Sequence, residues 1–284
     1  MTIEAKVIAH SRATGAPDLI TLQLRYPRMI HAEFMTHRVF SRNASSSRAI
    51  PVERMIQDVI DDPAMPVAWG SNKPGMQAGE EVSYYDRECA KEHWLSARDE
   101  AVSHAKSLVS HDLHKQIVNR LLEPFGHISV VCTGTDWQNF FDLRCHPDAD
   151  PTMRVLAEAM RYAIEGSEPT TEAWQEGRHH PYITFEDFAV VTSERLSENG
   201  NLKPNYERLM MISAARCARV SYLNHDGTDP DIEKDLALAK QLLESKHMSP
   251  FEHQAQFDPH TQGGPFGSNF DWHWKQHRKM VESQ

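Results

Sequence analysis

The residues best suited to chemistry lie in the stretch 28–51, RMIHAEFMTHRVFSRNASSSRAIP. Three consecutive serines at 45–47 end in Arg48, and two further arginines, Arg38 and Arg42, precede them. Hydroxyls, exposed amides and guanidinium groups are common donors to a bound phosphate or carboxylate. The stretch therefore predicts an anion-binding loop. A solvated helix end with a few surface cations explains the same composition, and composition alone does not separate the two.

Histidine and cysteine form no recognisable metal or disulfide pattern. The chain has 17 histidines, and the candidate pairs, His111 with His114 and His179 with His180, lack a carboxylate or third ligand at a known spacing. The four cysteines contain no CxxC pair. We therefore expect exposed or hydrogen-bonded histidines and no metal site.

The elements that position the serine stretch begin with two strands. Apolar residues alternate over 3–9 and again over 20–24, which predicts two strands joined by a turn. Pro27 then starts a helix whose apolar face carries Ile30, Phe34 and Met35. Because Ser and Asn side chains compete with helical hydrogen bonds, 43–48 is predicted to be a polar loop.

Helices dominate the rest of the chain. A short helix follows Pro51, and the loop 61–85 is long enough to suggest a functional lid, with disorder as the alternative. The helical pattern then runs nearly without a break through 86–122. We expect a strand at 128–131, followed by helices at 137–144, from Pro151, at 206–216 and from Asp229 to about His247.

Length and charge exclude some classes of protein. The 284 residues, 40% of them apolar, suffice for one large domain or two ordinary ones. No apolar run could span a bilayer and the first residues lack a signal-peptide core, so we expect a soluble, cytoplasmic protein, or one in the host cytoplasm if virally encoded. The net charge of −10 disfavours a nucleic-acid partner, but a local pocket for a small anion remains compatible with it.

Three blocks together resemble the flavin-dependent thymidylate synthase family. Residues 37–46, His-Arg followed by seven residues and Ser, are similar to the family signature Arg-His-Arg, seven residues, Ser. Residues 120–124 (RLLEP) and 136–144 (DWQNFFDLR) are similar to its later arginine–proline and Asn…Leu-Arg segments. Residues 218–222 (ARVSY) and 247–253 (HMSPFEH) are similar to its early Ala-Arg-Val-Ser and His…Pro-Phe-Glu-His segments. Each block alone is weak, but the three together are specific.

The order of the blocks differs from that of the family, in which the last two come first. Residues 1–165 resemble the family's central and C-terminal part, 204–257 resemble its N-terminal part, and 258–284 form a tail. The chain thus looks like a circular permutant, which is physically reasonable when the termini lie close together at the surface. We expect a single catalytic domain over 1–284.

The resemblance implies an α+β enzyme, with a mixed sheet flanked by long helices, that acts as a homotetramer with interfacial active sites. It implies FAD as cofactor, methylenetetrahydrofolate as one-carbon donor, NADPH as candidate reductant and a pyrimidine deoxynucleoside monophosphate as substrate. The residues implied to contact FAD are His37, Arg38, Asn43, Asn139, Leu143, Ser221, His247, Ser249 and Glu252. Those implied to hold the nucleotide phosphate are Ser46, Arg48 and Arg120, and Arg144 is implied to meet the pyrimidine.

The residue types suit these roles. Arginine offers a planar fork of donors for phosphate, and Arg144 can stabilise negative charge on the ring as C5 becomes nucleophilic. Ser46 is a weak nucleophile without a base, so phosphate or base binding is the better expectation for it. Cys145, in Arg-Cys-His-Pro, faintly resembles the nucleophile segment of the flavin-independent synthases, but a packed helix-end cysteine is the stronger interpretation.

Two positions depart from the family pattern. Thr36 stands where the family has its first arginine, and Glu33 stands where it has glutamine. An ionised carboxylate only accepts hydrogen bonds, so Glu33, if it faces the base, favours the amino group of cytosine over the oxygen of uracil. The alternative to conversion of dUMP to dTMP is therefore 5-hydroxymethylation of dCMP (or dUMP), with water in place of hydride capturing the one-carbon unit. Glu33 joins Arg144 and Ser46 as the candidate catalytic residues.

The tail and a rival function complete the expectations. Gln276 and Arg278 echo the missing glutamine and arginine, so the permuted chain can be expected to bring its tail back to the site. The alternative is a packed or interface segment. The rival from another class is a flavin-free protein that holds nucleic acid or phosphate with Arg38, Arg42 and Arg48.

Overall fold

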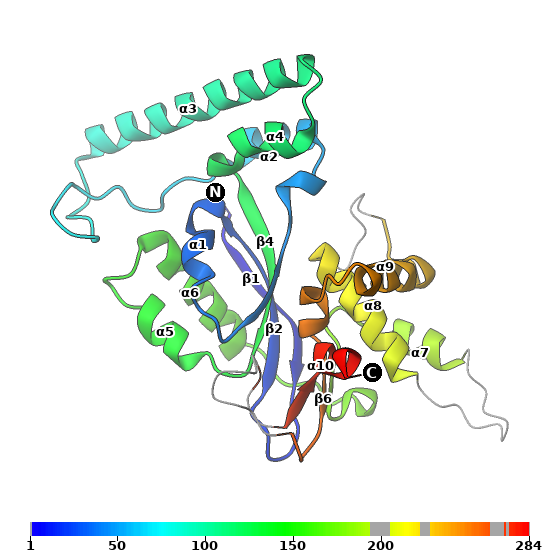
Figure 1. The fold of residues 1–284 in the computed structure, drawn as a ribbon. Coiled ribbons are helices and arrows are strands. Elements are labelled where there is room, and N and C mark those ends of the chain that lie inside the picture. The colour runs from blue at the N-terminus through cyan, green and yellow to red at the C-terminus, as the bar shows by residue number, and fades with distance from the viewer. Residues whose placement is uncertain (1, 194–204, 222–227, 262–269, 271–272, 284) are drawn as a thin grey trace, which may run out of the picture.

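The computed structural model describes residues 2–193, 205–221, 228–261, 270 and 273–283. These residues form an α+β fold in which helices flank a four-stranded sheet, as Figure 1 shows, so the expected α+β class is confirmed. The expected mixed sheet is instead antiparallel. None of the described helices is both long and apolar enough to cross a membrane.

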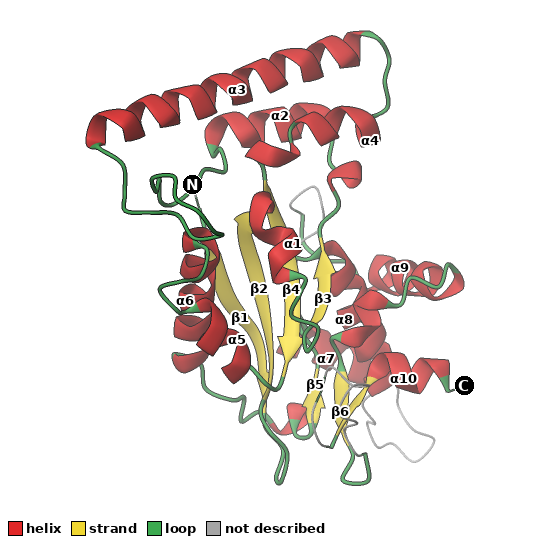
Figure 2. Cartoon of the chain, turned by 60° about the vertical axis from the view of Figure 1, so that its left-hand side comes forward, coloured by secondary structure: helices red, strands yellow, loops and turns green. Residues whose placement is uncertain are grey.

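The main sheet is antiparallel at each of its strand pairings. Its order is β1 (Glu4–Ser11), β2 (Leu19–Pro27), β4 (His127–Gly134) and β3 (Ser41–Ala44), so β1 and β3 are the edge strands, as Figure 2 shows. Thr21 lies opposite Thr133 across β2 and β4, and Asn43 lies opposite Val131 across β3 and β4.

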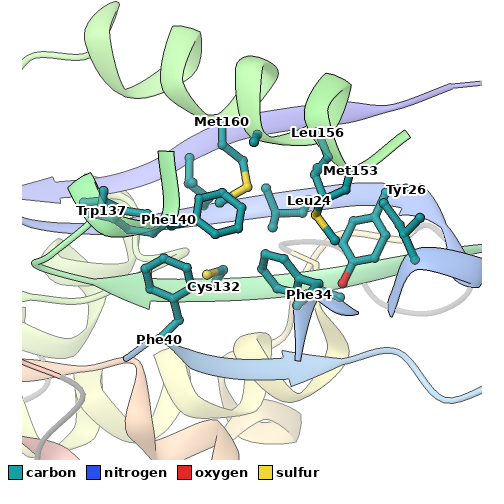
Figure 3. Close-up of a cluster of buried hydrophobic side chains, with 14 of the residues drawn as sticks. Leu24, Tyr26, Phe34, Phe40, Cys132, Trp137, Phe140, Met153, Leu156 and Met160 are labelled. Atoms are coloured by element: carbon teal, nitrogen blue, oxygen red, sulfur yellow. The ribbon is translucent and has the colours of Figure 1, made fainter. Parts of the chain in front are cut away.

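One face of this sheet is apolar and buried. Side chains alternate between the two faces of a strand, so the even-numbered residues of β2 and β4 share a face. It is covered by α5 (Gln138–Arg144), α6 (Pro151–Glu165) and the short α1 (His31–Phe34). Phe34, Phe40 and Phe140 meet Leu24 and Cys132 there, as Figure 3 shows.

The opposite face is mostly polar. It carries the odd-numbered residues, among them Gln23, Arg25, His127 and Ser129. Val131 is the apolar exception on β4, and it packs with Cys217 at the end of α8 (Tyr206–Arg219). α8 in turn packs against α9 (Ile232–Glu244), and both lie on this side of the sheet in Figure 1.

Two smaller layers complete the chain. Above the sheet, α2 (Val52–Asp61), the long α3 (Tyr84–Ser110) and α4 (Lys115–Val118) share a separate apolar core. At the other end, β5 (Arg178–His179), β6 (Ala255–Phe257) and β7 (Trp274–Gln276) form an antiparallel three-stranded sheet. Helix α7 (Phe185–Ser193) packs on α8, and α10 (His277–Glu282) follows β7.

Most of the expected elements are present, with four corrections. The helix after Pro27 is only a 3-10 turn followed by α1, and Met35 is exposed because the chain leaves the helix there. Residues 41–44 are strand β3, so the predicted polar loop begins after Ala44. The predicted helix over 86–122 breaks at 111–114, where Asp112 adopts a positive φ of 59°. The helix predicted over 206–216 continues to Arg219.

Candidate active site

A cleft of about 850 Å³ opens on the polar face of the sheet, beneath α2. Its floor is formed by β2 and β4, and its sides by β3 with the serine segment, the first turns of α2, the end of α8 and residues 247–250. Segments that are about 200 residues apart in the sequence therefore meet at one cavity, and we call it the sheet cleft.

Asn43 joins three walls of the sheet cleft. From β3, its side-chain Nδ2 donates to the Cys217 carbonyl at 2.8 Å, at the end of α8. Ser249 Oγ donates to its Oδ1 at 3.1 Å. Ser46, Ser221 and His247 line the same cavity, so the structure brings together five of the residues assigned by resemblance.

The wall at the end of α8 has an unusual backbone. Val220 ends the helix at φ 56° and ψ 32°, a left-handed conformation that is rare for a β-branched residue. Its side chain is buried with Val131, Tyr182 and Cys217, and this packing holds the conformation. Arg219 and Ser221, on either side of it, both line the cleft.

A buried ion network supports this wall. Arg216, fully buried in α8, donates to both carboxylate oxygens of Asp187, at 2.6 and 2.8 Å, and to Asp235 at 2.9 Å. Arg219 pairs with Asp235 at 2.6 Å. Two cations thus offset two carboxylates, which ties α7, α8 and α9 together.

The floor and outer wall of the sheet cleft contain residues that we did not predict. Arg25 donates to Asp62 at 2.8 Å, so its charge is matched locally. Burial lowers the pKa of His127 to about 4, with Arg25 as the next cause, so its imidazole is neutral at pH 7. Arg54 also lines the cleft, and within the described ranges it has no ion-pair partner. The alternation of Gln23 and Arg25 with Leu22 and Leu24, which predicts the strand, also indicates such a polar face.

The segment expected to bind phosphate is held next to the RLLEP block. Asn119 Nδ2 donates to the carbonyls of Ser47 and Ile50, at 2.7 and 3.0 Å. Glu123 accepts from Ser47 Oγ at 2.5 Å and from Arg120 at 2.9 Å. Ser46, Arg48 and Arg120 are exposed around this contact, which leaves their side chains accessible to a ligand.

A second group of candidate residues surrounds Arg144 on the opposite side of the sheet. Arg144, at the end of α5, forms an ion pair with Glu33 of α1, and its Nε donates to His37 Nε2 at 2.9 Å. Burial, then the nearby charges of Arg144 and Arg42, lower the pKa of His37 to about 4. His37 therefore accepts as a neutral imidazole, and its ring packs edge-on against Phe140 at 4.8 Å. We call Glu33, His37 and Arg144 the arginine cluster.

Comparison with known proteins identifies the family. Residues 18–170, more than half of the chain, match the thymidylate synthase complementing protein family. The chain belongs to this family. The match contains the arginine cluster, β3 and the serine segment, whereas residues 218–222 and 247–253 lie outside it.

Two solved structures of a UMP/dUMP methylase, PolB from Streptomyces cacaoi, are similar to the chain. The complex with 5-Br dUMP is 19% identical with a TM-score of 0.44, over 52% of this chain and 66% of that chain. The complex with 5-Br UMP is 16% identical with a TM-score of 0.46, over 57% and 88%. No curated protein sequence matches the chain.

The remaining candidates do not join either group directly. Arg38, Asn139 and Leu143 are exposed, and Glu252 lies beside Arg278 of the tail. Thr36, in place of the family's arginine, donates its hydroxyl to the Glu33 carbonyl at 2.7 Å, a local cap with no charge. Tyr222, the last residue of the ARVSY block, lies outside the described residues.

The cysteine and histidine expectations can now be compared with the structure. Cys145 follows the last residue of α5, packs against the apolar core, and has its pKa raised by burial, all of which favours the packed-cysteine interpretation. His179 is hydrogen-bonded to Ser11 and Thr21, at 2.9 and 2.6 Å. Over the described ranges, no three His, Cys, Asp or Glu residues are grouped as metal ligands.

Proposed function

We propose that the protein transfers a one-carbon unit from methylenetetrahydrofolate to C5 of a pyrimidine deoxynucleoside monophosphate with bound FAD, converting dUMP to dTMP. The observation that carries this proposal is the meeting of Asn43, Ser221 and Ser249 in the sheet cleft. They come from three separate segments, each assigned to the flavin by resemblance, and nothing in their sequence positions alone requires them to meet. Membership of the thymidylate synthase complementing family supports the same conclusion.

The chemistry of the sheet cleft fits a flavin nucleotide. Its volume lies in the range of cofactor pockets, and hydroxyl and amide groups line it. His127 Nε2 and Arg219 Nε are buried in its walls with no hydrogen-bond partner among the described residues. Asn43, Ser221 and Ser249 would hold the cofactor. When bound, FAD supplies the redox chemistry of the transfer, with NADPH proposed as its reductant.

The arginine cluster suits the pyrimidine end of the reaction. Arg144 is held in one orientation by Glu33 and by the neutral His37, so its guanidinium is preorganised. A fixed cation next to the ring stabilises the negative charge that develops as C5 becomes nucleophilic, without reorganisation during the reaction. Ser46, Arg48 and Arg120 would take the phosphate of the same nucleotide.

This assignment places one small substrate on two sides of the sheet. Ser46 lines the cleft on the polar face, whereas Arg144 lies on the face covered by α5 and α6. We infer that one active site takes its cleft from one chain and its arginine cluster from another, in a homotetramer. In an assembly with closed symmetry, every chain then contributes its cleft to one active site and its arginine cluster to another.

The test is direct. The purified protein is mixed with FAD, methylenetetrahydrofolate and NADPH, dUMP or dCMP is supplied, and the nucleotide product is weighed by mass spectrometry. We expect bound flavin absorbance and a methylated dUMP. A protein that takes up no FAD and leaves both nucleotides unchanged would contradict the proposal, and reactions lacking the folate serve as the matched control.

The alternative product is a 5-hydroxymethyl nucleotide made from dCMP. The observation in its favour is the carboxylate of Glu33 at the family's glutamine position, in contact with the very arginine assigned to the base. A carboxylate there accepts from the 4-amino group of cytosine. The product mass in the same assay distinguishes a hydroxymethylated from a methylated nucleotide. Glu33→Gln is expected to raise the ratio of dUMP to dCMP converted. A product seen only from dUMP, with the ratio unchanged in Glu33→Gln, would remove this alternative.

A further inference from the structure

The C-terminal tail packs against the segment that carries the HMSPFEH block. Strand β7 pairs with β6, and the His277 amide donates to the Gln254 carbonyl at 2.9 Å. Gln276 Nε2 donates to the Glu252 carbonyl at 3.1 Å and to Ser41 Oγ at 3.2 Å, at the start of β3. Both Gln276 and His277 are buried. The tail is thus fixed to a part of the site that lies outside the residues matching the family.

Arg278, at the start of α10, binds the side chain of Glu252. Its Nη1 donates to Glu252 Oε1 at 2.5 Å, and its Nε donates to Glu282 at 2.9 Å, one turn further along α10. Glu252 is the more buried partner, with 17% of its side chain exposed against 37% for Arg278. The contact therefore fixes the position of Glu252 more than that of Arg278.

The two carboxylate oxygens of Glu252 differ in their hydrogen bonds. Arg278 occupies Oε1, whereas Oε2 has no hydrogen-bond partner among the described residues and is not among their buried polar atoms without a partner. Arg42 on β3 adds an attractive charge nearby, and its own side chain is anchored to the Met35 carbonyl at 2.8 Å. A carboxylate with one oxygen fixed by a cation can accept a hydrogen bond from a ligand hydroxyl or N–H group through its other oxygen.

We propose that Arg278 is a positioning residue that holds Glu252 in the orientation needed to accept a hydrogen bond from the bound flavin nucleotide. The inference rests on the proposed function and on the assignment of Glu252 to the flavin by resemblance. Glu252 ends the 3-10 turn Ser249–Glu252, and Ser249 of this turn lines the sheet cleft. The inference also changes the expected role of the tail. The structure places Arg278 on Glu252 and Glu282, which its Nη1 and Nε groups bind. The tail acts through Glu252.

The test is a double-mutant cycle on FAD affinity in the full-length protein. Arg278→Met removes the charge and keeps most of the apolar stem, so the tail can stay packed. We expect it to weaken FAD binding about tenfold, the size typical of hydrogen bonds to a charged group. Glu252→Gln should weaken binding similarly, and the double variant should be no worse than Glu252→Gln alone. Arg278→Lys should recover most of the lost affinity.

Lys275→Met is the matched control, since Lys275 is an exposed cation on β7 and lies outside the proposed site. It should bind FAD like the wild-type protein. Arg278→Met binding FAD as tightly as this control would overturn the inference and leave the proposed function intact. So would losses that add in the double variant, or a loss of affinity that only matches a fall in melting temperature and that Arg278→Lys does not reverse. Failure of the wild-type protein to bind FAD would overturn the proposed function and this inference together.

Discussion

The sheet cleft and the arginine cluster lie on opposite faces of the same sheet and are built in opposite ways. The cleft gathers residues from five segments, and part of its wall comes from sequence outside the family match. The arginine cluster comes from α1, the loop after it and the end of α5, all within that match, and Arg144 binds both of the other side chains. The cleft is an open cavity lined by both polar and apolar groups, whereas the cluster is a compact ion pair with its hydrogen bonds made.

This difference indicates which parts of the fold hold each region in its geometry. A cavity formed by distant segments depends on the tertiary structure that brings them together, above all the ion network behind α8. The cluster joins only two segments through a partly exposed ion pair, so it can be altered with little effect on folding. Four changes test this contrast, in order of decreasing expected effect.

The first change removes the support of the cleft wall. Arg216→Met leaves Asp187 buried without its cation, and breaking one partner of a buried ion pair costs about 3–5 kcal/mol. We expect the free energy of unfolding, measured by urea denaturation, to fall by about that amount. A loss below about 1 kcal/mol would show that the wall does not depend on this network.

The second change removes the centre of the arginine cluster. Arg144→Met should lower turnover about 100- to 1,000-fold, since a preorganised charge at the reacting ring is lost. Its free energy of unfolding should fall by no more than about 1 kcal/mol, because the ion pair with Glu33 is partly exposed. Steady-state kinetics and a denaturation curve on the same sample check both. Turnover within tenfold of wild type would exclude the assigned role.

The third change is confined to the cleft. Ser249→Ala removes the hydroxyl that donates to Asn43, and we expect FAD affinity to fall about three- to tenfold, the effect of one neutral hydrogen bond. Flavin fluorescence titration measures it. Ser110→Ala, which removes an exposed hydroxyl bonded to the Ser107 carbonyl at the end of α3, is the control. Equal affinities in the two variants would count against the cleft as the flavin site.

The fourth change concerns acid stability. The pKa of His37 is lowered to about 4 from 6.5, so between these values the unfolded chain binds more protons than the folded one. Stability should therefore fall as pH drops from 6.5 to 4. Buried His253 and His180, each with a pKa lowered to about 3, act in the same direction. Melting temperatures of His37→Gln should decline less steeply over this window than those of the wild-type protein; identical slopes would contradict the shift assigned to His37.

The sequence predicted the elements whose residues follow a regular apolar pattern. Strands β1 and β2 and helix α6 appear where alternation or helical spacing placed them. Strand β3 was missed because its four residues, Ser-Arg-Asn-Ala, have no such pattern and are held in place by pairing with β4.

The blocks supplied a set of candidate residues without their spatial arrangement. Asn43 and Ser249 lie in the cleft and Arg144 in the cluster, and only the sheet order shows that Asn43 and Arg144 lie on different faces. Glu123, which accepts from both Ser47 and Arg120, was missed because its role depends on a contact 76 residues away in sequence.

The central claim is that the cleft of one copy works with the arginine cluster of another. Ser46→Trp fills the cleft and Arg144→Met disables the cluster, and each variant alone should be inactive. Mixed assemblies from co-expression should regain about a quarter of wild-type activity. Random association of the two chain types joins an intact cleft to an intact arginine cluster in about a quarter of the active sites. Purified mixed assemblies with no more activity than either variant alone would contradict the claim.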